Sequence, residues 1–157
     1  MDAQPPTAPD AAAPGTESAE PAGVATGERS KVLLIVEPDY MLRRTVALTA
    51  RSLDLGEINE TSTYEDAQGI LDGKHIDGML LALGDAEQGE VGLALLERVR
   101  AGEMKCAATL PIAVVVHQLD MARATRLRDL GVVYIAVRPA KARALLEALS
   151  AIARPRA

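Results

Sequence analysis

Residues 31–46 read KVLLIVEPDYMLRRTV, a stretch in which a continuous aliphatic run is followed at once by a segment of different periodicity. The run at 31–36 has the length and β-branched content of a strand buried on both faces of a sheet. The next segment, 38–53, is predicted to be a helix, and Asp39 stands where its N-cap is expected. Its apolar residues lie near helical spacing: Met41, Leu42, Val46 and Leu53. This order of strand and helix is the repeating unit of an α/β fold.

The same alternation continues to the end of the chain. Further strands are predicted at 56–63, 76–83, 110–116 and 132–137. Further helices are predicted at 64–73, 91–103, 120–131 and 141–154. Strands that alternate with helices through short loops require right-handed crossovers, so the sheet is parallel and has helices on both faces. We therefore expect a doubly wound, five-stranded parallel α/β domain.

Local signals refine this outline. Ser62 and Glu65 have the spacing of a capping box, and Gly131 is placed to close the helix at 120–131. We expect two further helices to turn apolar stripes toward the sheet. The residues of these stripes are Leu93, Leu96 and Val99 in one helix, and Leu145, Leu149 and Ile152 in the other.

Residues 1–30 have a different composition from the rest. They hold five of the nine prolines and many alanines, with Val24 as the one large aliphatic residue, so they cannot bury enough apolar surface to offset the entropy of ordering. We expect a disordered, Pro/Ala-rich acidic tail at 1–30 and one folded domain at 31–157. The tail has five acidic residues and one basic residue, so most of the net charge of −5 lies there. The charge balance therefore says little about what the domain binds.

Composition also limits the chemistry. The single cysteine, Cys106, excludes an internal disulfide, and no second cysteine or nearby histidine activates it, so we interpret it as an incidental thiol. His75 and His117 are far apart in sequence and form no metal-binding motif. The sequence has neither an apolar run of about 20 residues nor a secretory signal. We therefore expect a cytoplasmic protein that does not contact a membrane.

Ligands of such folds lie beyond the carboxyl ends of the strands. The stretches at these ends are 37–39, 82–84, 116–117 and 138–139. Together with their strands, in the segments LLIVEPDYMLRRTV, IDGMLLAL, LPIAVVVH and GVVYIAVRPA, they resemble the receiver domain of two-component response regulators, the CheY-like family, over residues 31–154. The resemblance implies the strand order 2-1-3-4-5 and a cis peptide bond before Pro139.

The residues that carry receiver chemistry differ here. Receiver domains phosphorylate an aspartate, hold magnesium with it and an acidic pair, and sense the phosphoryl group with a Ser/Thr and a Lys. The corresponding positions of this sequence hold Glu37 with Pro38, Ala82, Val116 and Arg138. A methyl group cannot attack phosphorus, and one glutamate beside a proline is a poor magnesium site. The resemblance therefore implies a degenerate receiver with no catalytic residue, no metal and no cofactor.

Charged residues near the substituted receiver positions allow alternative interpretations. Glu37 and Arg138 end neighbouring parts of the sheet and are either unrelated surface charges or an ion pair that replaces the metal. Asp85, three residues beyond Ala82, is a substitute phosphate acceptor or, as we favour, a solvated loop carboxylate. The aromatic residue that receivers use for switching corresponds to Ile135 rather than to Tyr134, so an ordinary relay is not expected. Tyr40 and Tyr64 are interpreted as packing or surface residues.

Arginines gather in the last third of the chain, on the side that receivers use for partners. The interaction residues predicted there are Arg123, Arg126, Arg128, Tyr134, Arg138 and Arg143. They form either a solvated face, with Asp120 and Asp129 pairing at i+3 to Arg123 and Arg126, or a docking surface for an acidic partner or anionic ligand. No helix-turn-helix is appended, so DNA binding is not expected.

We expect a non-catalytic, phosphorylation-independent interaction module of a bacterial two-component-type pathway. It would bind a protein partner, or a second copy of itself, through the helix at 120–131, the strand at 132–137 and the helix at 141–154. One alternative is a receptor for the second messenger cyclic di-GMP that uses the arginines. A second alternative is a phosphotransfer protein with a displaced acceptor.

Overall fold

The sheet has five parallel strands in the order β2-β1-β3-β4-β5. The computed structural model describes residues 30–154, so the tail predicted at 1–30 lies, apart from Ser30, outside the described residues. The strands are β1 (Val32–Val36), β2 (Glu57–Thr61), β3 (Gly78–Ala82), β4 (Ile112–Val116) and β5 (Tyr134–Val137). The predicted doubly wound fold and its strand order are thereby confirmed.

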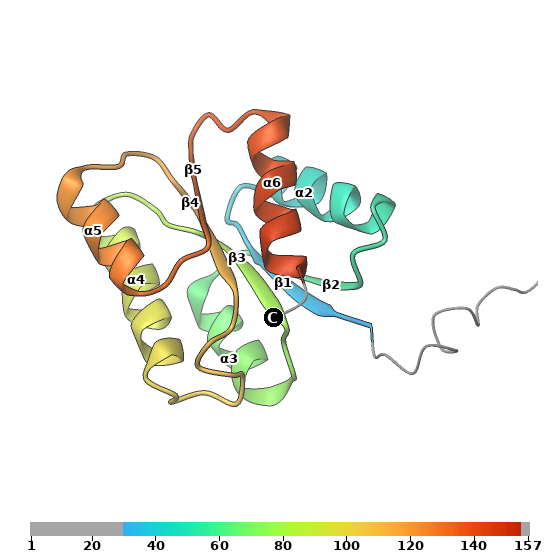
Figure 1. Cartoon of the computed structure of the whole chain (residues 1–157), viewed down its shortest axis with the longest axis horizontal. Coiled ribbons are helices and arrows are strands. Elements are labelled where there is room, and N and C mark those ends of the chain that lie inside the picture. The colour runs from blue at the N-terminus through green and yellow to red at the C-terminus, as the bar shows by residue number, and fades with distance from the viewer. Residues whose placement is uncertain (1–29, 155–157) are drawn as a thin grey trace, which may run out of the picture. The chain divides into compact units, whose positions relative to one another are not determined.

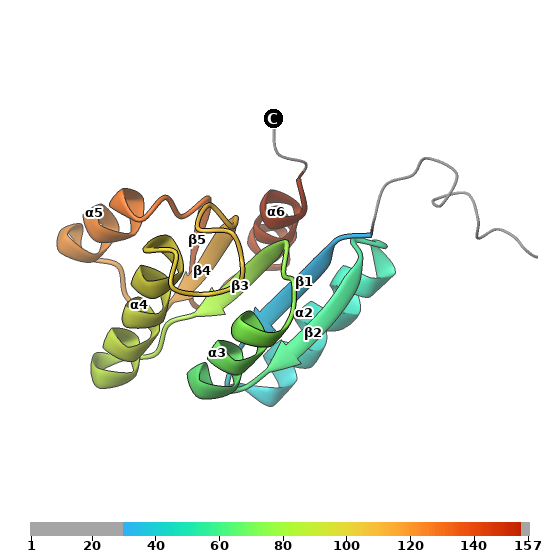
Figure 2. The ribbon, with the colours of Figure 1, turned by 90° about the horizontal axis from the view of Figure 1, so that it is seen from below.

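Five helices alternate with the strands and cover both faces of the sheet (Figures 1 and 2). They are α2 (Tyr40–Ser52), α3 (Tyr64–Gly73), α4 (Ala86–Arg100), α5 (Met121–Asp129) and α6 (Ala142–Ala153). Helices α2 and α6 pack on one face, and α3, α4 and α5 pack on the other. Each central strand divides its side chains between the two layers: Leu33 and Ile35 of β1 face α2 and α6, whereas Leu34 and Val36 face the other core.

The core consists of aliphatic residues, as the composition requires. Every residue of β3 and β4 is buried, so these strands read as continuous apolar runs rather than as alternating patterns. The stripes predicted for α4 and α6 are confirmed: Leu93, Leu96, Val99, Leu149 and Ile152 are buried, and Leu145 packs against the core at the rim. Within the described residues, no helix combines the length and the apolar character needed to cross a bilayer.

The predicted face of α2 is partly wrong. Val46 is buried and Leu42 is half-buried, but Met41 is 71% exposed and Leu53 is 46% exposed. Small residues, Ala47 and Ala50, complete the buried stripe, because they allow the helix axis to lie close to the sheet. Met41, Leu48 and Leu53 therefore face solvent.

Helix caps follow the sequence in part. Asp39 caps α2 as predicted, accepting from the N–H of Leu42 at 2.9 Å. Gly131 has φ +72° just after the C-cap of α5, which agrees with its predicted role. The predicted capping box at Ser62 is wrong, because α3 is capped by Thr63, whose hydroxyl accepts from the N–H of Asp66 at 3.0 Å. Ser62 stands one residue too early to reach the first turn.

Helix α4 begins at Ala86, five residues before the predicted start at 91. The prediction placed Gly89 in the loop before the helix, but Gly89 and Gly92 both lie inside the helix at close contacts. A Cβ atom at Gly89 would lie 2.5 Å from the carbonyl oxygen of Gly84, and one at Gly92 would lie 2.6 Å from Leu83 Cδ2. These glycines allow the helix to approach the end of β3 closely, so they are packing residues rather than helix breakers.

Candidate functional site

The carboxyl ends of β1, β3 and β5 surround a cavity of about 220 Å³. Its lining brings together most of the residues that the sequence placed there: Glu37, Pro38, Asp39, Ala82, Leu83, Gly84, His117 and Arg138. Val116 does not line it, because its side chain is fully buried in the core on the α4 side of the sheet. Val116 contributes main chain only, since its carbonyl oxygen accepts from the N–H of Arg138 at 2.8 Å.

Ala82 ends β3 at the base of this cavity. It is 2% exposed, and its methyl group belongs to the core that packs under α2 and α6. A methyl group has no lone pair to form a bond with an electrophile, so this position supplies no nucleophile. Its carbonyl oxygen is engaged as well, accepting from the hydroxyl of Tyr64 at 2.7 Å.

Glu37 and Arg138 form the predicted ion pair across the cavity. Arg138 Nη2 contacts Glu37 Oε1, and the second carboxylate oxygen accepts from the N–H of Asp39 at 2.9 Å. Glu37 is only 4% exposed, so both of its oxygens are satisfied by protein groups inside the fold. The peptide bond between Arg138 and Pro139 is cis, as the resemblance implied.

This arrangement places the Arg138 guanidinium against the carboxylate of Glu37. The carboxylate of Glu37 is already neutralised by the Arg138 guanidinium, so its attraction for a further cation is weakened. Pro38 adds no oxygen ligand from its side chain. Among residues 30–154, no group of three or more His, Cys, Asp or Glu side chains is placed to hold a metal ion.

Tyr64 is a site residue that the sequence interpretation missed. From the start of α3 its hydroxyl donates to the carbonyl of Ala82 and accepts from the N–H of Gly84 at 3.0 Å, so it bridges both sides of the strand end. Burial raises the pKa of this phenol, because the charged form is desolvated. The available signal was a tyrosine three residues after the end of β2, a strand whose carboxyl end shares the sheet edge of the site.

Asp85, the alternative acceptor, lies outside the Ala82 cavity. Its side chain is 70% exposed and both carboxylate oxygens lie 3.2 Å from Nδ1 of His117. It lines a neighbouring hollow of about 100 Å³ with Gln118 and Arg123. This position agrees with a loop carboxylate that joins the β3–α4 loop to the end of β4.

Two arginines of α5 form ion pairs with glutamates of α4, whereas the sequence predicted pairs with aspartates at i+3. Arg126 Nε donates to Glu97 Oε2 at 3.1 Å, and both Arg126 and Arg123 lie 3.5 Å from Glu90. The hydrogen bond to Glu97 raises the pKa of Arg126. The expected i+3 partner of Arg123 has another role, because the Asp120 carboxylate caps α5 by accepting from the N–H of Arg123 at 2.7 Å.

The remaining predicted interaction residues lie apart from these pairs. Arg128 and Arg143 are exposed, and the Tyr134 hydroxyl donates to Glu147 Oε1 of α6 at 2.7 Å, which raises the pKa of the phenol. Ile135, at the position of the family's switch aromatic, packs against the α4 side of the core. Cys106 is buried, and burial raises the pKa of its thiol, as suits an unreactive side chain.

Comparison with known proteins identifies the fold. No family model and no curated sequence matches the chain. Among solved structures, a response regulator receiver protein from Pseudomonas putida is 27% identical with a TM-score of 0.67, covering 78% of this chain and 98% of that one. The non-phosphorylated HemR receiver domain from Leptospira biflexa is 20% identical with a TM-score of 0.68, over 81% and 97%. The chemotaxis protein CheY4 of Vibrio cholerae is 15% identical with a TM-score of 0.66, over 79% and 99%.

Proposed function

We propose that this chain, which has the fold of response regulator receiver domains, is a signalling module that works without phosphorylation and acts by binding a protein partner. The receiver fold supports a role in a two-component-type pathway. The observation that carries the rest is the pairing of Arg138 with Glu37 across a cavity whose floor is the methyl group of Ala82. The phosphoacceptor and one of the acidic residues that hold the metal are replaced together.

The surroundings support a fixed conformation rather than a switch. Phosphorylation of an ordinary receiver changes the balance between two arrangements of the site and of the helices near it. In this chain Tyr64 holds the end of β3, and Glu90 and Glu97 hold α5 against α4 without any added group. A domain of this kind presents one constant surface to its partner.

The two alternatives have less support. A cyclic di-GMP receptor that uses α5 and the end of β5 needs free arginines there, but Arg123, Arg126 and Arg138 are each paired with a glutamate. Phosphotransfer through Asp85 needs a carboxylate near a metal site, whereas this carboxylate contacts His117. Both alternatives remain outcomes of the experiments below.

The decisive experiment incubates the full chain with acetyl phosphate and magnesium and measures its intact mass. A receiver domain with an acceptor aspartate serves as the positive control. We expect no phosphoryl adduct on this chain and no change in its NMR spectrum on addition of magnesium alone. A stable acid-labile adduct, at Asp85 or elsewhere, would contradict the proposal.

A further inference from the structure

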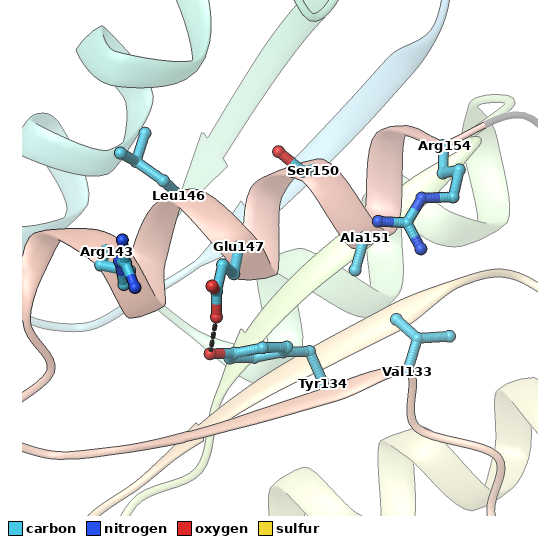
Figure 3. Close-up of a pocket in the computed structure, with 8 residues that line it drawn as sticks. All are labelled: Val133, Tyr134, Arg143, Leu146, Glu147, Ser150, Ala151 and Arg154. Carbon is cyan, nitrogen blue, oxygen red and sulfur yellow. Dashed lines mark hydrogen bonds between the residues drawn. The ribbon is translucent and has the colours of Figure 1, made fainter.

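An open groove of about 630 Å³ lies between β5 and α6 (Figure 3). We call it the β5–α6 groove, and its lining residues are Val133, Tyr134, Arg143, Leu146, Glu147, Ser150, Ala151 and Arg154. Val133 is 47% exposed and Leu146 is 39% exposed, so the groove offers apolar surface to solvent. Its volume lies in the range of clefts that hold ligands or peptide side chains.

The charged side chains that line the groove are two arginines and one glutamate. Arg143 lies near the start of α6 and Arg154 at its C-cap, and neither has an ion-pair partner among residues 30–154. Glu147, between them, accepts the hydroxyl of Tyr134. Two guanidinium groups that are unpaired within residues 30–154 therefore flank a centre that holds apolar side chains together with Glu147. Guanidinium groups are well suited to pair with carboxylates.

The adjacent strand is open on one side. β5 is the last strand in the sheet order and pairs with β4 alone. The N–H of Arg138 donates to the carbonyl of Val116 at 2.8 Å, and the N–H groups of successive strand residues alternate between the two edges of a strand. In the observed register the N–H groups of Tyr134 and Ala136 therefore face β4, and those of Ile135 and Val137 face the open edge, where a further strand finds donors.

We infer that the β5–α6 groove binds an extended, acidic peptide segment of a partner protein, which adds beside β5 as a further strand. This inference rests on the proposed function and names the surface and the chemistry of the partner. Main-chain hydrogen bonds to Ile135 and Val137 provide binding, and an apolar side chain of the peptide packs on Val133 and Leu146. Its carboxylates pair with Arg143 and Arg154.

The length of α6 sets the spacing of these carboxylates. Arg143 and Arg154 are eleven positions apart, which corresponds to about 16 Å along a helix with a rise of 1.5 Å per residue. An extended chain rises about 3.3 Å per residue, so about five residues cover the same span. The matching peptide therefore carries two acidic residues about five positions apart, with an apolar residue between them.

The test titrates the full chain, labelled with ¹⁵N, with a peptide of six residues that has glutamate at both ends and alternating valine and threonine between them. We expect saturable shifts of the amides of Ile135 and Val137. A peptide with lysine at both ends should bind at least tenfold more weakly. Shifts that gather on α4 or α5, or no binding at millimolar peptide, would overturn the inference.

Charge-reversal variants test whether binding depends on the groove or on the overall charge of the domain. We expect Arg143→Glu combined with Arg154→Glu to weaken the glutamate peptide at least tenfold, while Arg128→Glu, an equally exposed change on α5, leaves affinity within twofold. Circular dichroism melting curves verify that both variants fold. Equal affinities for the two variants would overturn the inference.

Other occupants give distinct results. Binding of cyclic di-GMP in place of the peptide, with the same dependence on Arg143 and Arg154, would make the groove a nucleotide site. Concentration-dependent dimerisation that the double variant abolishes, without peptide binding, would assign the groove to a second copy. Either result overturns the inference but leaves the phosphodonor experiment unaffected, so failure of the groove and failure of the proposed function are distinguishable.

Discussion

Glu37 and Arg138 form an ion pair that joins the end of β1 to the end of β5. The carboxylate is almost fully buried and the side chain of Arg138 is 19% exposed, so each depends on the other for neutralisation. Removing one partner of such a pair leaves a charge in a poorly solvated place, which costs more than the pair itself contributes. The pair is therefore a fixed structural element, and its loss has a measurable cost.

We predict that Glu37→Gln lowers the free energy of unfolding by about 2 kcal/mol, because the Arg138 guanidinium loses its counter-charge while remaining largely buried. Urea denaturation measures the change. The matched control is Glu57→Gln, which removes an exposed pair with Lys74 and should cost clearly less, because both groups are well solvated. Equal effects of the two substitutions would show that the buried pair has no special role.

A second residue-level prediction concerns Tyr64. Tyr64→Phe removes the hydroxyl that joins Ala82 to Gly84, so two main-chain groups lose a partner, and we expect a loss of about 1–2 kcal/mol. Hydrogen exchange at the amide of Gly84 should accelerate. Tyr40→Phe is the control, because Tyr40 is 62% exposed, and it should leave both quantities unchanged.

The raised pKa of Tyr64 gives stability a pH dependence. Because burial disfavours the phenolate, the folded state keeps this proton to a higher pH than the unfolded state does. The contribution is complete below about pH 10, the usual tyrosine pKa, and is lost as pH rises above it. We expect the stability of the native chain to fall more steeply above this pH than that of Tyr64→Phe. Parallel curves from denaturation at several pH values would contradict the assignment.

At the level of elements, α4 depends on glycine for its contact with β3. We predict that Gly92→Ala costs about 1–3 kcal/mol, because the added Cβ would lie 2.6 Å from Leu83 Cδ2 and 2.9 Å from the Tyr64 ring. Gly69→Ala in α3 is the matched control, since its Cβ would meet nothing within 4 Å. That change should stabilise the fold by about 0.5–1 kcal/mol through helix propensity. Thermal unfolding of the two variants should therefore shift in opposite directions.

The elements also show what sequence reasoning captures. Strands β3 and β4 were predictable because buried parallel strands are continuous apolar runs with clear ends. The start of α4 was not, because Gly89 is typical of a loop and its role depends on a contact with Gly84. Local composition does not encode such contacts.

The same limit applies to the site. The Glu37 and Arg138 pair was predictable because both residues end strands and carry opposite charges. The Tyr64 bridge was not predictable, because its partners are main-chain atoms of Ala82 and Gly84. Main-chain groups are the same for almost every residue type, so the sequence does not reveal such a contact. The pairing of α5 with α4 was missed for a related reason: nearby aspartates at i+3 offered a simpler explanation than glutamates about thirty positions away.

At the level of the whole molecule, the proposed function predicts that restoring the acceptor alone fails. Ala82→Asp supplies a carboxylate, but Pro38 still lacks an oxygen ligand and Arg138 is placed to pair with the new group. We expect no phosphoryl adduct with acetyl phosphate and magnesium, measured by intact mass. Transfer to this single variant would show that the cavity keeps more of its chemistry than we infer.

The Glu37 and Arg138 pair has a consequence for how such a domain would be controlled. A domain held by an internal ion pair needs neither a metal ion nor a phosphodonor. Chelators and changes in the cell's supply of phosphodonors therefore do not alter it. Its partner then responds to how many copies are present rather than to their chemical state. Synthesis and degradation become the variables that set the output.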